Sequence, residues 1–494
     1  MTGHGQTCRR LLGTLLLAGS MLVGAGTAAA IPVPEDDPFY AVPDGITAKA
    51  NGTVLNSREI EASSFGLPLP ATAWQVQYKT LDSTSRPSAD VATILVPKAA
   101  WTGSGSRPLI SYQTPEDAVA GKCSPSYSLR GGPTAGNETE TLTIGLALSR
   151  GFAVIAPDYE GPESTFYAAP GQAHGVLDGV RAAQRFGPSG FTKRTPIALW
   201  GYSGGSVAST QAALWQPVYA PELKLSGIAL GGLVADLQPT IEDFERLGLG
   251  GAIPIGLIGL QRAYPAIDVS QYLNAAGKAA VAAMQDGCVT DGVTKYPGLR
   301  TEDIEASPGA WFSPGLQALF HDNSPAGIAG VPTAPVYDYH AVLDELAPIA
   351  NDRAMMHRLC DAGVTVQHVE TAGTEHDTEA IVRASDALDF FAARFAGTPA
   401  VNTCDSIPAA PAAPAPVNVP TAAPKAHACR RITLRIRRLR HVHVTVDGRR
   451  VAVHRRGRTT RATIKPAGGT VTVRVTGRTK RGKRVVRVRR YHRC

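Results

Sequence analysis

A serine flanked by glycines is the first group in the sequence that could carry out covalent chemistry. The segment Gly201-Tyr202-Ser203-Gly204-Gly205 follows a short apolar run, Ile197–Trp200, and precedes a helix-like stretch, Gly205–Trp215. A G-x-S-x-G sequence between a strand and a helix is typical of a tight turn that exposes the serine hydroxyl as a nucleophile. The expected chemistry is attack on a carbonyl carbon with formation of an acyl intermediate. An idle serine in a glycine-rich turn is the alternative interpretation.

A nucleophilic serine needs a base that accepts its proton and a carboxylate that orients the base. When the serine follows a strand in this way, the acid and then the histidine come later in the chain, in loops after strands. The segment Pro335–Tyr339 precedes Asp344, and the segment Val364–Val369 precedes His376. We therefore predict that Ser203, Asp344 and His376 are nucleophile, acid and base. Other candidates for the acid or the base remain. Glu345 neighbours Asp344, and four more residues lie in strand or helix patterns, namely Asp338, His340, His357 and His368.

Alternating strand-like and helix-like segments predict a layered α/β fold with a mostly parallel sheet. Short apolar runs are expected for strands that are buried on both faces. The candidates are Pro108–Tyr112, Phe152–Ala156, Ile197–Trp200, Gly227–Gly231, Pro335–Tyr339 and Val364–Val369. Helix-like stretches such as Gly175–Phe186 lie between them and are expected to form the crossovers.

A long insertion separates the nucleophile from the acid. Residues 236–330 are far more than a connection between two strands requires, so we expect a helical cap there. Within it, Leu247–Leu260 is apolar for 14 residues. This is too short to span a bilayer but suits a pocket for acyl chains. Packing inside the cap is the alternative interpretation.

The first 30 residues have the composition of an export signal. Arg9 and Arg10 precede an apolar stretch, and Ala28–Ala30 supplies the small residues of a cleavage site. The mature chain is therefore expected to begin at Ile31 and to be secreted. No later segment is apolar for 18 residues, so no transmembrane helix is expected.

Six cysteines remain after removal of this leader, at positions 123, 288, 360, 404, 429 and 494. An even number in an exported protein predicts disulfides. Cys429 and Cys494 stand at the two ends of a basic segment and are predicted to pair with each other. Since the sequence contains no C-x-x-C pair, a zinc site is not expected. We expect neither a metal nor a cofactor.

The net charge of +8 conceals two parts of opposite sign. Residues 429–494 contain 23 Lys or Arg and a single acid, whereas residues 31–428 contain 40 acids and 24 bases. A Pro- and Ala-rich linker, 405–428, separates an acidic domain at 31–404 from this basic tail. The tail is predicted to bind anionic cell-surface polymer or lipid headgroups, and so to associate with a cell surface. A solubilising appendage is the alternative, and export argues against a nucleic-acid partner.

Alternating valines predict that the tail is a small antiparallel β domain. Asp447-Gly448 is typical of a type I′ hairpin turn, which would place Val444 opposite Val451 and Val442 opposite Val453. All four valines would then share one face. The pattern is repeated in Ile432–Ile436, Val471–Val475 and Val486–Val488.

From about Asp37 to Cys404 the chain resembles the secretory lipases of the α/β-hydrolase superfamily, found in fungi and actinobacteria. The shared motifs are DPFY at Asp37–Tyr40, SYQTPEDA at Ser111–Ala118, PDYEG at Pro157–Gly161, WGYSGGS at Trp200–Ser206, YAPEL at Tyr219–Leu223, YHAVLDELAP at Tyr339–Pro348 and C-x-x-G-x-x-V at Cys360–Val366. Matched position by position, the resemblance implies the same nucleophile, acid and base as the residue patterns above.

The resemblance also implies an oxyanion hole at Asp117 and at the backbone amide of Gly204. An ionised carboxylate would repel an oxyanion, so either the backbone N–H of Asp117 or its protonated side chain would serve. It further implies two disulfides, Cys123–Cys288 and Cys360–Cys404.

The expected function is that of a secreted serine hydrolase that cleaves carboxylic esters, most simply a triacylglycerol lipase with an ester or lipid substrate. An acyltransferase that uses the same acyl-enzyme is one alternative. A non-catalytic α/β-hydrolase scaffold that binds a surface is the other.

Overall fold

The computed structural model describes residues 31–133, 138–409, 432–446, 449–457, 459–464, 471–480 and 482–491. The chain forms two compact units, Met1–Pro411 and Ala412–Cys494. The predicted leader, most of the predicted linker and the predicted Cys429–Cys494 disulfide lie outside the described residues. Within the described ranges, no helix is long and apolar enough to cross a membrane.

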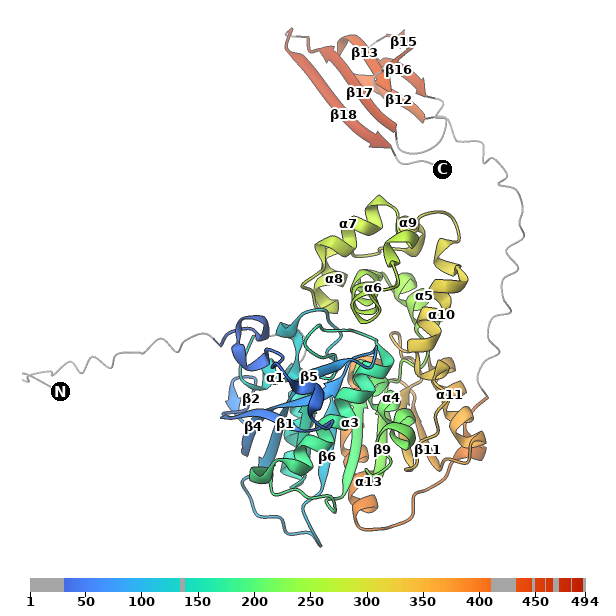
Figure 1. Cartoon of the computed structure of the whole chain (residues 1–494). Helices are drawn as coiled ribbons and strands as arrows, with labels where there is room; N and C mark the ends of the chain where they lie inside the picture. Colours follow the sequence, from blue (N-terminus) through green and yellow to red (C-terminus); the bar gives the residue numbers. More distant parts are fainter. Residues whose placement is uncertain are drawn as a thin grey trace, which may run out of the picture. The chain divides into compact units, whose positions relative to one another are not determined.

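The described part of the first unit is built around a nine-stranded, mostly parallel sheet (Figure 1). In sheet order the strands are β1 (Val54–Ile60), β4 (Ala71–Leu81), β5 (Pro87–Pro97), β7 (Ala153–Pro157), β6 (Leu109–Gln113), β8 (Ile197–Tyr202), β9 (Leu225–Gly231), β10 (Val336–Ala341) and β11 (Val366–Thr371). The strands from β7 to β11 run parallel to one another, and β1, β4 and β5 add an antiparallel edge. A short ribbon of β2 (Ser63–Ser64) and β3 (Leu67–Pro68) lies apart from this sheet. The predicted α/β fold class is confirmed.

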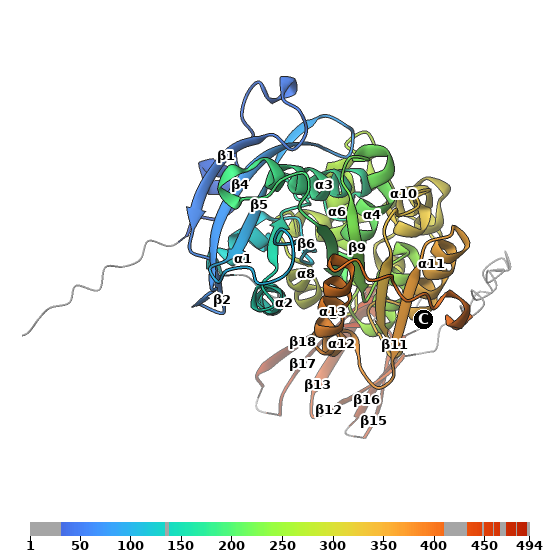
Figure 2. The same cartoon turned by 90° about the horizontal axis from the view of Figure 1, so that it is seen from below.

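Helices cover both faces of this sheet because successive side chains of a strand point to opposite sides. On β8, Ile197 and Leu199 belong to the core formed with α3 (Ala169–Arg185), α4 (Gly204–Tyr219) and α11 (Ile349–Asp361). Ala198 and Trp200 belong to the opposite core, formed with α2 (Glu138–Ser149) and α13 (Ala384–Phe395). Figure 2 shows α3 and α4 on one side of the sheet and α13 on the other. The sheet is thus buried on both sides, and functional groups are left at its edges and strand ends.

Helices between β9 and β10 gather at one end of the first unit (Figure 1). They are α5 (Leu237–Leu247), α6 (Ala252–Ala263), α7 (Ala275–Ala283), α8 (Val289–Lys295), α9 (Thr301–Ile304) and α10 (Pro314–Asn323). This segment, called the cap below, has a core of its own that includes Ile241, Leu257, Leu260 and Phe320. Two short helices complete the unit, α1 (Pro125–Leu129) and α12 (His376–Val382).

The second unit contains two antiparallel sheets around a small apolar core. One has the order β12 (Ile432–Arg437), β16 (Thr459–Ile464), β15 (Val453–Arg456). The other has the order β14 (Arg449–Val451), β13 (Arg440–Val446), β17 (Val471–Arg478), β18 (Arg484–Tyr491). Val444, Val473 and Ala462 are buried in the core.

Of the two valine pairs predicted for the hairpin of the second unit, one is correct and the other is wrong. Val444 pairs with Val451, as expected. Val453, however, pairs with Ala462 in the other sheet, and not with Val442. The strand ends at Val451 and the chain changes sheets, which brings Val442 and Val453 to the core from two sheets instead of one. Val486 and Val488 also depart from the predicted pattern, because both are exposed.

Candidate active site

Ser203 occupies a sharp turn between β8 and α4. Its backbone angles are φ 52° and ψ −124°, which a non-glycine residue adopts only under strain. The Ser203 N–H donates to the carbonyl of Gly231 at 2.9 Å, and the Ser203 carbonyl accepts from the N–H of Ser206 at 2.9 Å. The turn therefore fixes the backbone on both sides of the hydroxyl.

The glycines around this serine are required by close packing. A Cβ on Gly201 would lie 2.1 Å from the carbonyl oxygen of Gly205, and a Cβ on Gly205 would lie 1.9 Å from that of Gln113. A Cβ on Gly204 would lie 1.9 Å from Asp117 Oδ1. These distances explain why small residues are needed on both sides of Ser203. They also show that the Asp117 side chain packs against the turn.

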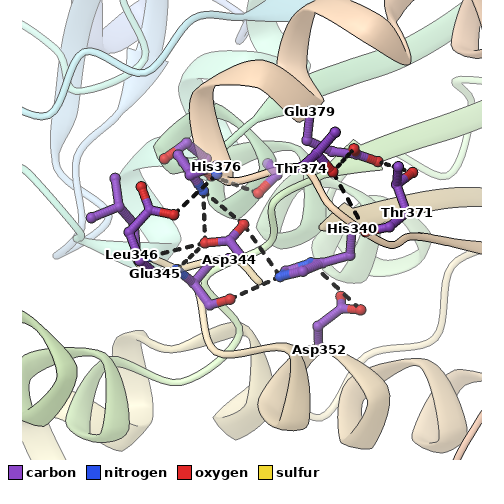
Figure 3. A network of polar contacts seen from close by, with 12 residues as sticks. His340, Asp344, Glu345, Leu346, Asp352, Thr371, Thr374, His376 and Glu379 are labelled. Carbon is purple, nitrogen blue, oxygen red and sulfur yellow. Dashed lines mark hydrogen bonds and ion pairs between the residues drawn. The ribbon is translucent and has the colours of Figure 1, made fainter. Parts of the chain in front are cut away.

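His376 is held by Asp344 in the loop region beyond β10 and β11 (Figure 3). The imidazole Nδ1 lies 2.8 Å from Asp344 Oδ2 and 2.9 Å from Oδ1. His376 is 2% exposed, and its Nε2 has no hydrogen-bond partner among the described residues. The side chain therefore has one ring nitrogen fixed and the other unused, as a base facing a substrate would need.

Burial alone would lower the pKa of His376, because it disfavours the charged form. The hydrogen bond that His376 donates to Asp344, the negative charge of Asp344 and the charges of Asp377 and Glu345 outweigh burial and raise this pKa above its ordinary value. Burial alone would raise the pKa of Asp344, but His376, His340 and the amide of Ala347 lower it below its ordinary value. Asp344 therefore stays ionised beside the imidazole.

The Asp344 carboxylate is fixed from behind by backbone and by a second histidine. Its Oδ1 accepts from the N–H groups of Leu346 at 3.0 Å and Ala347 at 2.6 Å. His340 Nε2 lies 3.4 Å from Asp344 Oδ2, and His340 Nδ1 lies 3.6 Å from Asp352 Oδ2. His340 and Asp352 are fully buried. A chain of polar groups thus runs from His376 through Asp344 into the protein (Figure 3).

Asp338, Asp352 and His368 form a buried cluster next to this chain, with ligand atoms within 4.8 Å of one another. His368 uses both ring nitrogens, Nδ1 with Asp338 at 2.5 Å and Nε2 with Glu370 at 2.9 Å. Burial would lower the pKa of His368, but these two carboxylates raise it to about 9. Burial and the Asp338 charge raise the pKa of Asp352 well above its usual value. Asp338 Oδ1 and both carboxyl oxygens of Asp352 lack a hydrogen-bond partner among the described residues.

The loop that presents His376 is secured at several points. The buried Glu379 carboxylate accepts from the hydroxyls of Thr371 at 2.8 Å and Thr374 at 2.7 Å (Figure 3). The Tyr202 hydroxyl donates to the carbonyl of His376 at 2.5 Å, and the His376 N–H donates to Glu345 at 3.1 Å. The imidazole position is therefore set by its own loop and by the strand that precedes Ser203.

Asp117 lies in the loop after β6 and reaches the same region. Its φ is +44°. Burial raises the pKa of its carboxyl to about 6, although a charged His376 would lower it. Burial and the Asp117 charge raise the pKa of Glu160, while the backbone N–H groups of Ala118 and Asp117 lower it. Both carboxyl oxygens of Glu160 lack a hydrogen-bond partner among the described residues, and the Asp117 side chain is directed toward Gly204.

The loop that carries Asp117 is joined to the cap. The N–H of Val289 donates to the carbonyl of Asp117 at 2.8 Å, and the N–H of Val119 donates to that of Gly287 at 2.9 Å. A disulfide links Cys123 in this loop to Cys288 at the start of α8. The second disulfide, Cys360–Cys404, fastens the end of α11 to the segment after α13. Both are pairings that the family resemblance implies.

Two cavities meet at Ser203 and Asp117. The first runs under the cap and is lined almost wholly by apolar groups, including Phe166, Leu257 and Trp311. The second is more polar and extends past His376, with Glu140, Tyr202, Thr290 and Asp377 in its walls. An elongated apolar group and a polar group can therefore approach Ser203 from two sides.

The structure brings Ser203, His376, Asp117 and Gly204 to these cavities and places Asp344 on His376. Of the other candidates, Asp338 and His368 contact each other, and His357 Nε2 contacts the carbonyl of Pro408 at 3.1 Å. Glu345 accepts from the backbone N–H of His376. Sequence reasoning missed the support given by His340, Asp352, Glu379 and Tyr202. His340 lies four residues before Asp344, a spacing that offered a weak signal.

Comparisons with known proteins give a consistent result. A family model described as "Secretory lipase" matches residues 132–403. Lipase 9 of Candida albicans is 32% identical over 394 residues, covering 76% of this chain and 85% of that protein. A Mycobacterium tuberculosis protein described as "Probable inactive lipase" is 35% identical over 375 residues, covering 74% of this chain and 83% of that protein. The solved structure of Candida antarctica lipase A in its closed state matches with a TM-score of 0.71 and 29% identity, over 78% of this chain and 91% of that chain.

Proposed function

The chain belongs to the secretory lipase family of α/β-hydrolases, and we propose that it is an exported triacylglycerol lipase that acts through Ser203, His376 and Asp344. The observation that carries this proposal is the arrangement at the junction of the two cavities. Ser203 lies in a strained turn there, beside a buried His376 whose Nδ1 is 2.8 Å from Asp344 and whose Nε2 is unused.

In the proposed mechanism, His376 Nε2 accepts the hydroxyl proton as Ser203 Oγ attacks the ester carbonyl carbon. The imidazolium that forms keeps its Nδ1 proton, which is hydrogen-bonded to Asp344, and the Asp344 charge stabilises it. Collapse of the tetrahedral intermediate breaks the bond to the alcohol oxygen, which takes the proton from Nε2. Water then repeats the sequence on the acyl-enzyme and releases the fatty acid.

The negative charge on the carbonyl oxygen needs donors that are already in place. Gly204 is the first residue of α4, so its N–H has no partner within the helix and can serve. Asp117 supplies the second donor through its protonated side chain, which packs against Gly204 beside Ser203. The pKa of about 6 for Asp117 makes the protonated form accessible near neutral pH.

The two cavities suit the two parts of a lipid ester. The apolar cavity under the cap takes the acyl chain, which contacts Leu257 and Leu260 on α6. These residues belong to the apolar stretch predicted to line such a pocket. The more polar cavity past His376 takes the glyceryl part and lets water enter.

The proposal also includes export and the domain boundaries drawn from the sequence. Residues 1–30 are the leader, 31–404 the catalytic domain with a cap at about 236–330, 405–428 the linker and 429–494 the basic domain, closed by Cys429–Cys494. N-terminal sequencing of the secreted protein is expected to start at Ile31. Alkylation followed by mass measurement is expected to find no free thiol.

The test of the catalytic proposal compares wild type with Ser203→Ala on emulsified triglyceride and on p-nitrophenyl esters of increasing chain length. We expect wild type to hydrolyse both and the variant to lose activity by at least about 10^4-fold. Equal activity of the two proteins would remove Ser203 from the mechanism. A wild type without activity on any ester would favour the non-catalytic scaffold. Transfer of the acyl group to an added alcohol in preference to water would favour the acyltransferase.

A further inference from the structure

The outward side of one sheet in the second unit presents arginines and valines together. In the sheet β14-β13-β17-β18, Val444 and Val473 point inward to the core. Because side chains alternate along a strand, Arg474 and Arg478 on β17 point outward. The register places Val488 opposite Arg474 and Arg484 opposite Arg478, so these residues share the outward side. We call this side the arginine–valine face.

Two valines on this face are unusually exposed. Val486 and Val488 are 43% and 54% exposed, and they are the only large apolar side chains counted as exposed among the described residues of this unit. Val486 lies opposite Thr476, between the rows that contain Arg474 and Arg478. The residue next to Val486 lies on the other side of the sheet, because Val485 is opposite Gly477 on the core side. The chain thus sets two apolar groups among arginines that face solvent.

The charges on this face have no acidic partner among the described residues of the unit. The described residues of the second unit contain no Asp or Glu, and none of the recorded ion pairs involves them. The outward side of the other sheet is also basic, with Arg435 opposite Arg461 and Arg456 opposite Thr459. Among the residues of that sheet whose side chains are described, none is a large apolar residue that is exposed. The two sides therefore differ in apolar content more than in charge.

We propose that the arginine–valine face binds the surface of an anionic phospholipid bilayer. Guanidinium groups bind phosphate oxygens through paired hydrogen bonds, and basic segments are attracted to anionic leaflets. The valines enter the boundary between headgroups and acyl chains. A purely charged polymer has no apolar region for them to contact. This surface holds the enzyme on a lipid phase, and it acts whether or not the first unit is catalytic.

The experiment measures sedimentation of the full-length Ser203→Ala protein with vesicles, so that no lipid is hydrolysed. The probes are vesicles of phosphatidylcholine alone and vesicles of equal parts phosphatidylcholine and phosphatidylglycerol. We expect binding to the anionic vesicles only, and its loss at 1 M salt, where charges are screened beyond about 3 Å. Replacing Arg474, Arg478 and Arg484 by Gln is expected to weaken binding by about 100-fold, from about fivefold per arginine.

The matched control neutralises three arginines on the other sheet, with Arg435→Gln, Arg456→Gln and Arg461→Gln. This variant has the same net charge, and we expect it to lose less than about fivefold in vesicle binding. Replacing Val486 and Val488 by Ser is expected to weaken vesicle binding while leaving binding to soluble polyphosphate unchanged. Since all these side chains are exposed, the variants are expected to unfold at the temperature of the parent protein.

Three results would overturn the proposal. No binding to anionic vesicles at low salt would show that the face is not a lipid surface. Equal losses in the two arginine variants would show that net charge alone acts. An unchanged affinity in the valine variant, with polyphosphate bound as tightly as vesicles, would point to an anionic polymer instead.

Discussion

Replacing Asp117 separates the two ways in which this residue could stabilise an oxyanion. Asp117→Ala keeps the backbone N–H and removes the side-chain donor, whereas Asp117→Asn supplies a side-chain donor that never ionises. The Asp117 side chain packs against Gly204 beside Ser203 and lines both cavities. We therefore expect the side chain to be the donor. Its removal should lower kcat by about 10^2- to 10^3-fold, or about 2.7–4 kcal/mol of transition-state stabilisation.

The pH dependence of activity follows from two groups, because His376 must be deprotonated while Asp117 is protonated. His376 must be neutral to accept a proton, which favours pH values above its raised pKa. Asp117 must be protonated to donate, which favours pH values below its own pKa of about 6 while His376 is charged. Because only the charged imidazole lowers the Asp117 pKa, neutralising His376 lets Asp117 keep its proton to higher pH. Wild type should therefore show a bell-shaped profile of kcat/KM, with an alkaline limb due to Asp117.

The assay is hydrolysis of a soluble short-chain p-nitrophenyl ester between pH 5 and 9, with kcat and KM measured for wild type, Asp117→Ala and Asp117→Asn. We expect Asp117→Asn to keep more activity than Asp117→Ala and to lose the alkaline limb. Circular dichroism of each variant controls for folding. An Asp117→Ala enzyme within about threefold of wild type would refute the side-chain role and return it to the backbone amide.

Three further changes test other parts of the structure. Leu257→Asp puts a charge into the apolar cavity, so kcat/KM should fall far more for long-chain than for short-chain esters; equal losses would exclude this cavity as the acyl site. Cys123→Ser with Cys288→Ser opens a link with a sequence separation of 165, so urea unfolding should show a loss of up to about 5 kcal/mol, and an unchanged midpoint would contradict this. Asp352 keeps a proton in the folded state that the unfolded chain loses above pH 4, so its contribution to stability falls as pH rises. Asp352→Asn should make the stability less dependent on pH above about pH 4, and parallel curves for the two proteins would refute the assignment.

The sequence was most informative where the pattern of apolar residues along a segment agrees with its burial in the folded sheet. Most of the parallel strands β6 to β11 were predicted from short apolar runs, which suit burial on both faces, whereas β10 and β11 also contain polar residues. The antiparallel strands β4 and β5 were missed. On β4 the residues Gln75, Gln77 and Lys79 are buried, so the strand reads as polar although it lies inside the protein. Gln75 and Gln77 donate to the carbonyls of Ser126 and Ala41, contacts that cannot be foreseen from spacing.

In the candidate site, too, some residues could be predicted from the sequence and others could not. Ser203, Asp344 and His376 could be proposed because each follows a strand in a fixed order along the chain. His340 could only be assigned to a strand, since its approach to Asp344 depends on how the loop after β10 folds back. In the second unit, alternation could not decide between Val485 and Val486 as the inward residue. The pairing of β17 with β18 decides it, and that pairing is a tertiary fact.

The attachment of the Asp117 loop to the cap links the two cavities mechanically. Arg262 on α6 donates to the carbonyl of Val119 at 2.7 Å and to that of Glu163 at 2.9 Å. Together with the disulfide and the backbone pairing to Gly287 and Val289, this contact holds the loop at several points. The helix that lines the apolar cavity is therefore fixed to the loop that carries the proposed oxyanion donor. A displacement of α6 would therefore strain the contacts that join this helix to the Asp117 loop.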